Sequence, residues 1–252
     1  LIRKGVKHLT VIGNDAGLPV GAYGAETARG IGKLVEAGMV DHIIASHVGM
    51  NPLIGEGMIN GTLKCTLVPQ GTLAEKIRAA NYGLGGVLTP TGVGTPVETE
   101  LDELGREKKV VEIEGKKYLL ELPLRADYAF CRASICDKFG NFRCDKATKN
   151  FNYVMAGAAD HVIVERASRV RLEGGHERRA TDTEFPRKVG GKDLRAVTFR
   201  KRTDDVVEEL VDHGFCAEFT GTENKCVAVQ VIVGGVGAFD RRNRKSDLGK
   251  RR

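Results

Sequence analysis

The chain has 252 residues and a formal net charge of +6, which together bound its size and class. This length allows one large α/β domain or two smaller ones, and either can bury most of the apolar surface of a core. No apolar run approaches the roughly 18 residues that a membrane-spanning helix needs. We therefore expect a cytoplasmic protein that does not insert into a membrane.

The excess of positive over negative charge lies entirely in the last third of the chain. Residues 1–165 hold 19 Lys plus Arg and 19 Asp plus Glu, whereas residues 166–252 hold 20 and 14. A basic segment can bind nucleic acid or a membrane surface, but this one mixes both signs and has few aromatic residues. We expect an α/β domain at 1–165 and a basic extension of uncertain order at 166–252.

Cysteine and histidine usage argues against metal chemistry. The six cysteines include no Cys-x-x-Cys pair, which is typical of reduced thiols in a cytoplasm. The spacing of Cys131, Cys136 and Cys144 matches no zinc pattern, and the six histidines include no His-Glu-x-x-His motif. We predict no metal site.

The first elements alternate between strand and helix. β-Branched residues predict a strand at 9–12, and glycines flank the turn at 13–17, in which Asn14 and Asp15 are good turn formers. A weak helical pattern covers 19–37 and ends at Gly38. A second strand at 41–46 leads to His47, which we interpret as a structural histidine because no Ser or Cys partner lies nearby in the sequence.

The stretch 67–98 has the order of elements that builds a site. A strand should end at Pro69, and the Thr72 and Glu75 pair forms a capping box that predicts a helix from about Leu73. Gln70 and Gly71 then lie between the carboxyl end of a strand and the amino end of a helix, where open α/β sheets bind ligands. On these residues alone, a plain connector in which Gly71 supplies an unusual backbone angle is an equally good interpretation.

The later segments complete an α/β pattern. A strand at 84–88 is followed by a loop whose Gly92 and Gly94 let the backbone approach a ligand closely. The charged segment 98–117 predicts a surface hairpin that turns at Glu114 and Gly115, with solvated acidic residues. Further strands are predicted at 128–133 and 161–165, with a helix between them. The alternation predicts an open, mostly parallel, doubly wound α/β sheet flanked by helices.

The extension contains two segments with recognisable patterns. Residues 203–211 have a helical pattern with an acidic start, and residues 227–240 read as a strand followed by a glycine turn. The Gly-Val-Gly of that turn lacks the third glycine of a dinucleotide fingerprint. We therefore assign no cofactor to it.

Several separated motifs, in order, resemble one enzyme family. VPQGTLAEKIRA and GLGGVLTPTGVGTPVE are similar to the alpha subunit of the family I coenzyme A transferases, above all the acetate, butyrate or succinyl to acetoacetate enzymes. LTVIGNDAG and IIASHVGMNPLIGEGMINGTL extend the resemblance upstream; KKYLLELPLRADYAF, DKFGNF and ATKNFN extend it downstream. Family members have an additional strand-helix unit before the position of Leu1, and the resemblance fails after Glu165. We therefore expect the domain at 1–165 to lack the usual N-terminal strand-helix unit, and the sequence does not decide whether the chain is a complete subunit.

The resemblance implies a fold and a reaction. It implies an alpha-subunit-type α/β fold that moves CoA between an acyl-CoA and a short-chain carboxylic or 3-oxo acid, through a glutamyl-CoA intermediate. The nucleophilic glutamate of that family belongs to the beta subunit, in a Glu-Asn-Gly motif. This chain has none, because Glu223-Asn224 is followed by Lys225. The resemblance thus implies half a pocket in an α2β2 assembly, with acyl-CoA as substrate and no permanently bound cofactor.

The resemblance also names site residues. It implies no catalytic nucleophile on this chain and gives Gln70 a supporting role beside the reacting thioester. The other implied substrate-binding residues are Asn14, Asp15, Asn51, Gly71, Gly92, Gly94 and Thr95. The family has phenylalanine at the position of Val87 and glycines at those of Ala80 and Asn81. We expect these departures to alter packing near the pocket more than the reaction class.

Two other functions fit the same α/β pattern. A stand-alone enzyme that binds a phosphate or a sugar phosphate would use the same glycine turns. A nonenzymatic RNA-binding module would instead use the basic extension.

Overall fold

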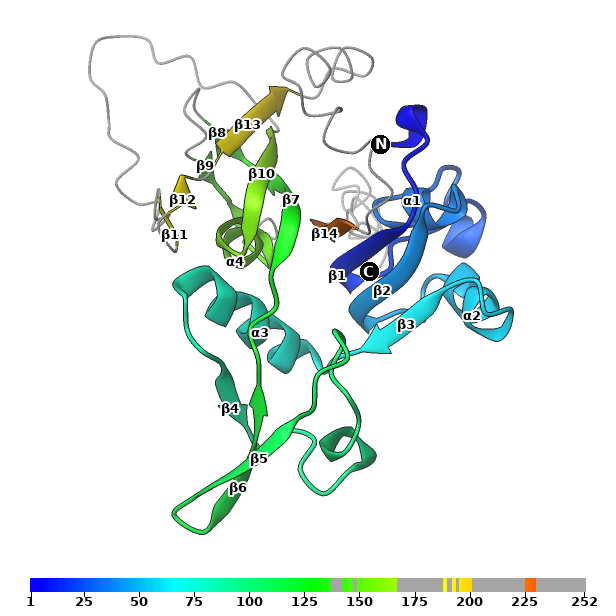
Figure 1. Cartoon of the computed structure of the whole chain (residues 1–252). Helices are drawn as coiled ribbons and strands as arrows, with labels where there is room; N and C mark the ends of the chain where they lie inside the picture. The colour runs from blue at the N-terminus through cyan, green and yellow to red at the C-terminus, as the bar shows by residue number, and fades with distance from the viewer. Residues whose placement is uncertain are drawn as a thin grey trace, which may run out of the picture.

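The computed structural model describes residues 1–136, 142–146 and 149–166, together with the backbone of short strands at 188–189, 192–193, 195–200 and 225–229. Its centre is a seven-stranded sheet in the order β13-β10-β7-β14-β1-β2-β3 (Figure 1). Every neighbouring pair in this sheet is parallel. The strands are β1 (Leu9–Asp15), β2 (Val40–His47), β3 (Lys64–Leu67), β7 (Ala126–Ala133), β10 (Ala159–Arg166), β13 (Arg195–Arg200) and β14 (Lys225–Val229).

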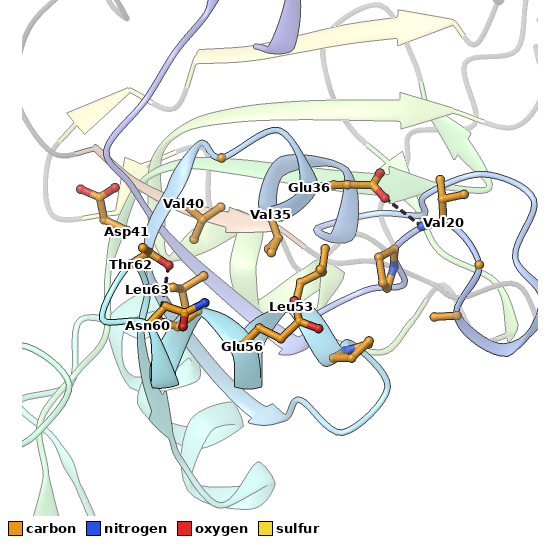
Figure 2. A pocket seen from close by; sticks show the side chains of 16 residues that line it. Val20, Val35, Glu36, Val40, Asp41, Leu53, Glu56, Asn60, Thr62 and Leu63 are labelled. Atoms are coloured by element: carbon orange, nitrogen blue, oxygen red, sulfur yellow. Dashed lines mark hydrogen bonds between the residues drawn. The ribbon is translucent and has the colours of Figure 1, made fainter.

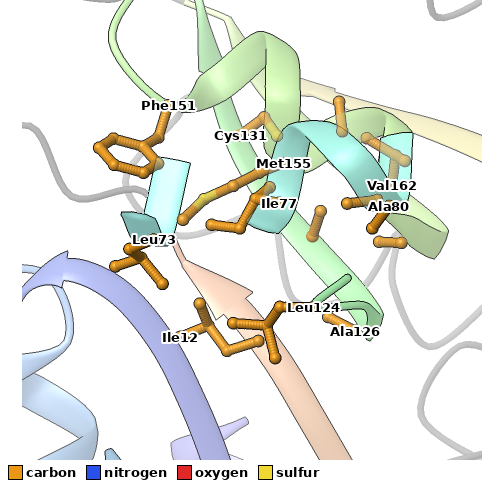
Figure 3. Close-up of a cluster of buried hydrophobic side chains, with 14 of the residues drawn as sticks. Ile12, Leu73, Ile77, Ala80, Leu124, Ala126, Cys131, Phe151, Met155 and Val162 are labelled. Atoms are coloured by element: carbon orange, nitrogen blue, oxygen red, sulfur yellow. The ribbon is translucent and has the colours of Figure 1, made fainter. Parts of the chain in front are cut away.

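Helices cover both faces of the parallel sheet. One core cluster joins Ile12 of β1 to Leu73 and Ile77 of α3 (Gln70–Tyr82) and to Met155 of α4 (Asn152–Gly157) (Figure 3). A second cluster joins Val11 and Ile43 to residues around α1 (Gly32–Glu36) and α2 (Pro52–Ile59). The strands are apolar on both sides because both faces are buried, as in other parallel sheets. The predicted doubly wound α/β fold is confirmed.

A separate three-stranded antiparallel sheet carries the glycine loop. Its order is β4-β6-β5, with β4 (Val87–Thr89), β5 (Lys109–Ile113) and β6 (Lys116–Glu121). Glu114 and Gly115 both have positive φ, 51° and 75°, as the two central residues of a tight hairpin turn require. The predicted hairpin is therefore confirmed, but β4 pairs with this hairpin and not with the parallel sheet.

The acidic residues of the hairpin segment are not all solvated, as the sequence led us to expect. Asp102 is 7% exposed and Glu103 is 3% exposed. Both face cationic side chains, Arg106 and Lys76 respectively. Buried carboxylates require such partners, and this pairing explains why two acidic residues enter the protein here.

Most of the helix predicted at 19–37 does not form. The segment instead contains a 3-10 turn, η2 (Ala22–Gly24), and an antiparallel bridge between Leu18 and Arg29, before the short helix α1. Gly21, Gly24 and Gly30 have φ values of 81°, 72° and 57°, which a right-handed helix excludes. The predicted closure at Gly38 is confirmed by its φ of 61°.

Helix α3 begins three residues earlier than predicted and has no capping box. Leu73 N donates to Pro69 O at 2.8 Å, so helical hydrogen bonding starts at Pro69. Thr72 is buried, and Glu75 pairs with Arg78 at 2.6 Å instead of reaching back to the helix start. Gln70 is therefore the first residue of the helix, and its side-chain amide projects from the first turn.

The remaining described elements are short. They are η1 (Ile2–Lys4), η3 (Pro96–Glu98), β8 (Ile135–Cys136), β9 (Phe142–Arg143), β11 (Lys188–Val189) and β12 (Lys192–Asp193). Among the described residues, no helix is both long and apolar enough to cross a membrane.

Parts of the basic extension belong to the main sheet. β13 pairs with β10, and β14 lies between β1 and β7. β14 overlaps the first residues of the strand predicted at 227–240. The rest of that segment, its glycine turn and the helix predicted at 203–211 lie outside the described residues. The division between 1–165 and 166–252 stays a prediction.

The crossing of α3 and α4 leaves no room for a methyl group at Gly157. An ideal Cβ on Gly157 would lie 1.6 Å from Asn81 Oδ1 and 2.3 Å from Asn81 Cγ. Asn81 is 5% exposed, and the two helices meet at this point beside the core. A side chain at 157 must therefore displace Asn81.

We expect Gly157→Ala to lower the free energy of unfolding by about 1–3 kcal/mol, the usual cost of overpacking a buried contact. Gly55→Ala in α2 is the matched control, because its Cβ would meet nothing within 4 Å. The control should be neutral or stabilising by up to about 1 kcal/mol, since alanine favours helix. Urea unfolding of both variants measures the difference, and equal stability would contradict the close crossing.

Candidate functional site

Three polar side chains meet where β1, β2 and the β3–α3 connection end. Gln70 Nε2 donates to Asn14 Oδ1 at 2.7 Å, and Ser46 Oγ lies 2.9 Å from the same oxygen and 2.7 Å from Asn14 O. Asp15 of β1 is in register with His47 of β2, so these strands finish side by side. Parallel strands bring residues 32 and 56 positions apart into one cluster.

The Gln70 side chain is exposed at the amino end of α3. Its hydrogen bond to Asn14 uses only one of its polar groups. A primary amide has two N–H donors and one carbonyl acceptor. Asn14 Oδ1 accepts one of the two N–H groups, and this contact also fixes which way the amide of Gln70 faces. The first turn of α3 adds backbone N–H groups without helical partners and the positive end of the helix dipole. The arrangement suits an oxygen on which negative charge accumulates.

Asp15 and Asn51 hold the turn that follows β1. Asp15 Oδ1 accepts from Gly17 N at 2.7 Å, while Asn51 Nδ2 donates to Ala16 O at 2.8 Å. Asn51 is 1% exposed, and its Oδ1 also accepts from Leu53 N at the start of α2. The amide of Asn51 is therefore engaged within the chain, where it joins the end of β1 to α2.

The electrostatic state of Asp15 reflects two opposing effects. Burial raises the pKa of the Asp15 carboxyl, whereas the Gly17 N–H and the nearby His47 act to lower it, and burial prevails. His47 is itself exposed beside this carboxyl. Asp15 is thus a partly shielded acid at the carboxyl end of β1.

The glycine loop closes on itself. Gly92 and Gly94 have φ values of 94° and 73°, and Thr95 Oγ1 donates to Gly92 O at 2.8 Å. Gly94 N donates to Glu98 Oε2 at 2.6 Å. These φ values favour glycine at both positions, while the predicted close approach to a ligand stays a prediction. Because β4 belongs to the antiparallel sheet, the convergence of parallel strands does not by itself bring this loop to Asn14 and Gln70.

Gly71 does not supply an unusual backbone angle. It lies in the first turn of α3, is exposed, and is not among the glycines with positive φ. The connector interpretation, in which Gly71 forms the turn, is therefore wrong. What Gly71 contributes is an open helix start, because a Cβ there would meet nothing within 4 Å.

A cavity of about 730 Å³ lies elsewhere, between the segment after β1 and helices α1 and α2 (Figure 2). Its lining includes Glu36, Asp41 and Glu56 and contains no lysine or arginine. None of the predicted site residues lines it. Its acidic wall would repel a phosphate-bearing ligand such as an acyl-CoA.

The described residues show no metal cluster and no activated thiol. No group of three or more potential metal ligands occurs among them. Cys131 and Cys144 are buried, and burial raises the pKa of the Cys131 thiol far above its ordinary value. Neither cysteine is suited to act as a nucleophile.

Ser46 belongs to this site although the sequence pattern alone does not single it out. It ends the strand predicted at 41–46, and in the structure it lies one residue before the end of β2, as Asn14 does in β1. Parallel pairing places such residues side by side once the register is known.

Comparisons with known proteins agree on one family. The coenzyme A transferase family profile matches residues 1–181. The acetate CoA-transferase subunit alpha of Escherichia coli is 47% identical over 165 residues, covering 66% of this chain and 68% of that subunit. The acetoacetyl-CoA:acetate/butyrate CoA transferase alpha subunit of Clostridium acetobutylicum is 46% identical over 173 residues, covering 69% and 72%.

A solved structure supports the fold. The glutaconate coenzyme A-transferase of Acidaminococcus fermentans superimposes with a TM-score of 0.58 at 18% identity. The match covers 79% of this chain and 63% of that chain.

We expect Gly17→Ala to destabilise the turn beside the site more than Gly38→Ala does. Both glycines have left-handed φ, 65° and 61°, which costs alanine about 1–2 kcal/mol. A Cβ on Gly17 would also lie 2.5 Å from Arg29 O and Gly32 N, whereas one on Gly38 would meet nothing. The extra loss at Gly17, about 1–3 kcal/mol by overpacking, is measured by urea unfolding. Equal losses would contradict this close backbone contact.

We expect His42 to weaken the fold as the pH falls. Burial, assisted by the charge of Lys64, lowers the pKa of His42 to about 4, and its Nε2 lies 2.8 Å from Thr66 Oγ1. The folded pKa lies below the ordinary value of about 6.5, so the stabilisation is complete above pH 6.5 and is lost between pH 6.5 and 4. His42→Gln should therefore reduce the loss of stability between pH 7 and pH 5 in urea unfolding. A loss of stability in His42→Gln equal to that of the wild type would contradict this assignment.

Proposed function

Because this chain belongs to the coenzyme A transferase family, we propose that it serves as the alpha subunit of an enzyme that moves CoA between an acyl-CoA and a short-chain carboxylic or 3-oxo acid. The names of the matched relatives, acetate and acetoacetyl-CoA:acetate/butyrate transferases, support this substrate class. A cytoplasmic location is part of the same proposal and rests on cysteine usage.

One observation carries the proposal: the Asn14–Gln70 contact at the amino end of α3. The second N–H of Gln70 would donate to the thioester carbonyl oxygen as that oxygen becomes negative. Ser46 and Asn14 would hold the amide in place, so the donor needs no reorganisation during the reaction. The open start of α3 at Gly71 would let backbone N–H groups approach the same oxygen.

The nucleophile would come from a beta subunit. Its glutamate carboxylate would attack the thioester carbonyl, and CoA thiolate would leave as an acyl anhydride forms. The thiolate would then attack the glutamyl carbonyl, giving glutamyl-CoA and the free acid, and the acceptor acid would reverse these steps. This chain has no Glu-Asn-Gly motif, so we propose that it is inactive alone and works in an α2β2 assembly.

The other predicted site residues have supporting roles in this proposal. Asp15 and Asn51 would shape the wall of the site by holding the turn after β1. Gly92, Gly94 and Thr95 would face the ligand or the partner subunit with backbone groups. Acyl-CoA is a substrate in this scheme, and no step needs a permanently bound cofactor.

We expect Gln70→Ala to slow turnover by about 10-fold to 1000-fold, the usual effect of losing one oxyanion donor. The measurement is acetoacetate-dependent CoA transfer by the chain assembled with its beta subunit, and assembly should be unchanged. Asn60→Ala is the control, because Asn60 lines the acidic cavity and should leave turnover unaltered.

Unchanged turnover in Gln70→Ala would remove Gln70 from the mechanism. Covalent labelling of this chain alone by acyl-CoA and borohydride would instead favour a stand-alone enzyme. A salt-sensitive gel shift with RNA, lost on deleting residues 166–252, would favour the RNA-binding alternative.

A further inference from the structure

A buried group of charges joins α3 to the antiparallel sheet. Lys76 of α3 is 0% exposed. Its Nζ lies 2.7 Å from Glu121 Oε2 of β6 and 3.1 Å from Glu103 Oε1, and the two glutamates are 3% exposed. A hydrophobic core can form without a buried lysine and two buried carboxylates, so this group of charges calls for a separate explanation.

Three further side chains complete this charge cluster. Lys108 Nζ lies 3.3 Å from Glu121 Oε1, and Arg106 Nε lies 2.6 Å from Asp102 Oδ2. The cluster of Lys76, Glu103, Glu121, Lys108, Asp102 and Arg106 therefore contains equal numbers of cations and anions. Burial acts to raise the pKa of Asp102, but hydrogen bonds from Arg106 and Leu104 N–H outweigh it and hold that pKa below its ordinary value.

The charge cluster is connected to the glycine loop through one face of β6. Side chains alternate along a strand, so Glu121 and Leu119 share a face. Gly92 packs on that face, because a Cβ there would lie 3.0 Å from Leu119 Cδ1 and 3.2 Å from Val97 Cγ1. One face of β6 thus carries both Glu121, which pairs with Lys76, and Leu119, which lies next to Gly92.

The same helix carries Gln70 at its first turn. Lys76 O also accepts from Leu124 N at 3.1 Å, so the chain leaving β6 is fastened to α3 as well. One helix thus carries Gln70 at its first turn and is joined at Lys76 both to β6 and to the chain that leaves β6.

Charge pairs define this position more narrowly than apolar contacts would. Apolar side chains can slide past one another at little cost, whereas a buried ammonium group must stay beside its carboxylates or lose the attraction that offsets its desolvation. The net stabilisation from such a cluster is small, since desolvation cancels most of that attraction. A role in geometry therefore accounts for the cluster better than a role in stability.

We propose that Lys76 is a positioning residue, which sets the antiparallel sheet and its glycine loop against the helix that carries Gln70. The proposal rests on the proposed CoA-transfer function for its kinetic consequences. Its structural consequence, the placement of the loop, is independent of that function.

The test removes two cations and two anions together, so that no remaining charge of the cluster loses its partner. The neutral variant combines Lys76→Met, Lys108→Met, Glu103→Gln and Glu121→Gln, which keep similar side-chain volumes and leave the Arg106–Asp102 pair intact. Lys76→Met alone would take the buried ammonium from Glu103 and leave Glu121 with Lys108 alone, and should fold poorly. Arg78→Gln is the matched control, because it removes an exposed ion pair from the same helix.

We expect the neutral variant, assembled with its beta subunit, to melt within a few degrees of the wild type. Amide hydrogen exchange in residues 90–98 should quicken about tenfold while that of α3 stays unchanged. Turnover should fall by about 10-fold to 100-fold, the range for misplacing a group in a site. The loss should be smaller in a Gln70→Ala background, because both changes act on one arrangement.

Several outcomes would overturn the proposal. Wild-type loop exchange in the neutral variant would show that packing alone places the loop. Unfolding of the neutral variant would make Lys76 a folding residue. If the wild-type assembly lacks CoA-transfer activity, the proposed function fails, and the exchange measurement still decides whether Lys76 positions the loop.

Discussion

The parallel pairing of β1, β2 and β3 is the constraint on which the site depends. Parallel strands end at the same edge of a sheet, so the residues that leave them are brought together without any local sequence relation. Asn14, Ser46 and Gln70 meet for this reason, although they come from three different segments. Helices bury both faces of the sheet, whereas this edge is open to solvent at Gln70, which is exposed at the start of α3.

The sequence predicted what local chemistry determines. Apolar runs located the strands, Gly38 ended a helix, and the Glu114–Gly115 turn formed a hairpin. Features that depend on residues far apart in the sequence were predicted poorly. The acids at 102 and 103 look solvated until Lys76 is placed beside Glu103, and β4 looks like part of the parallel sheet until β6 pairs with it. Ser46 is identified as a site residue only once the register of β1 with β2 places it beside Asn14. The contact of Asn14 with Gln70 was within reach because both lie at predicted strand ends.

The departures from the family pattern at Ala80 and Asn81 fall away from the strand ends. Both residues are buried on α3, and Asn81 packs against Gly157 of α4. A larger residue at 81 is accommodated only because its neighbour across the helix crossing is glycine. The departure at Asn81 therefore lies at the α3–α4 contact, near the opposite end of the helix from Gln70, whereas the departure at Val87 lies on β4.

The distribution of charge separates the proposed site from the large cavity. The amino end of α3 presents unpaired N–H groups and the positive end of a helix dipole beside Gln70. The cavity between α1 and α2 presents Glu36, Asp41 and Glu56. The proposed thioester, which gains negative charge on its oxygen and carries phosphates, would be stabilised at the first and repelled at the second. The cavity is the roomier of the two places, but the charge of the proposed ligand favours the edge of the sheet where β1, β2 and α3 meet.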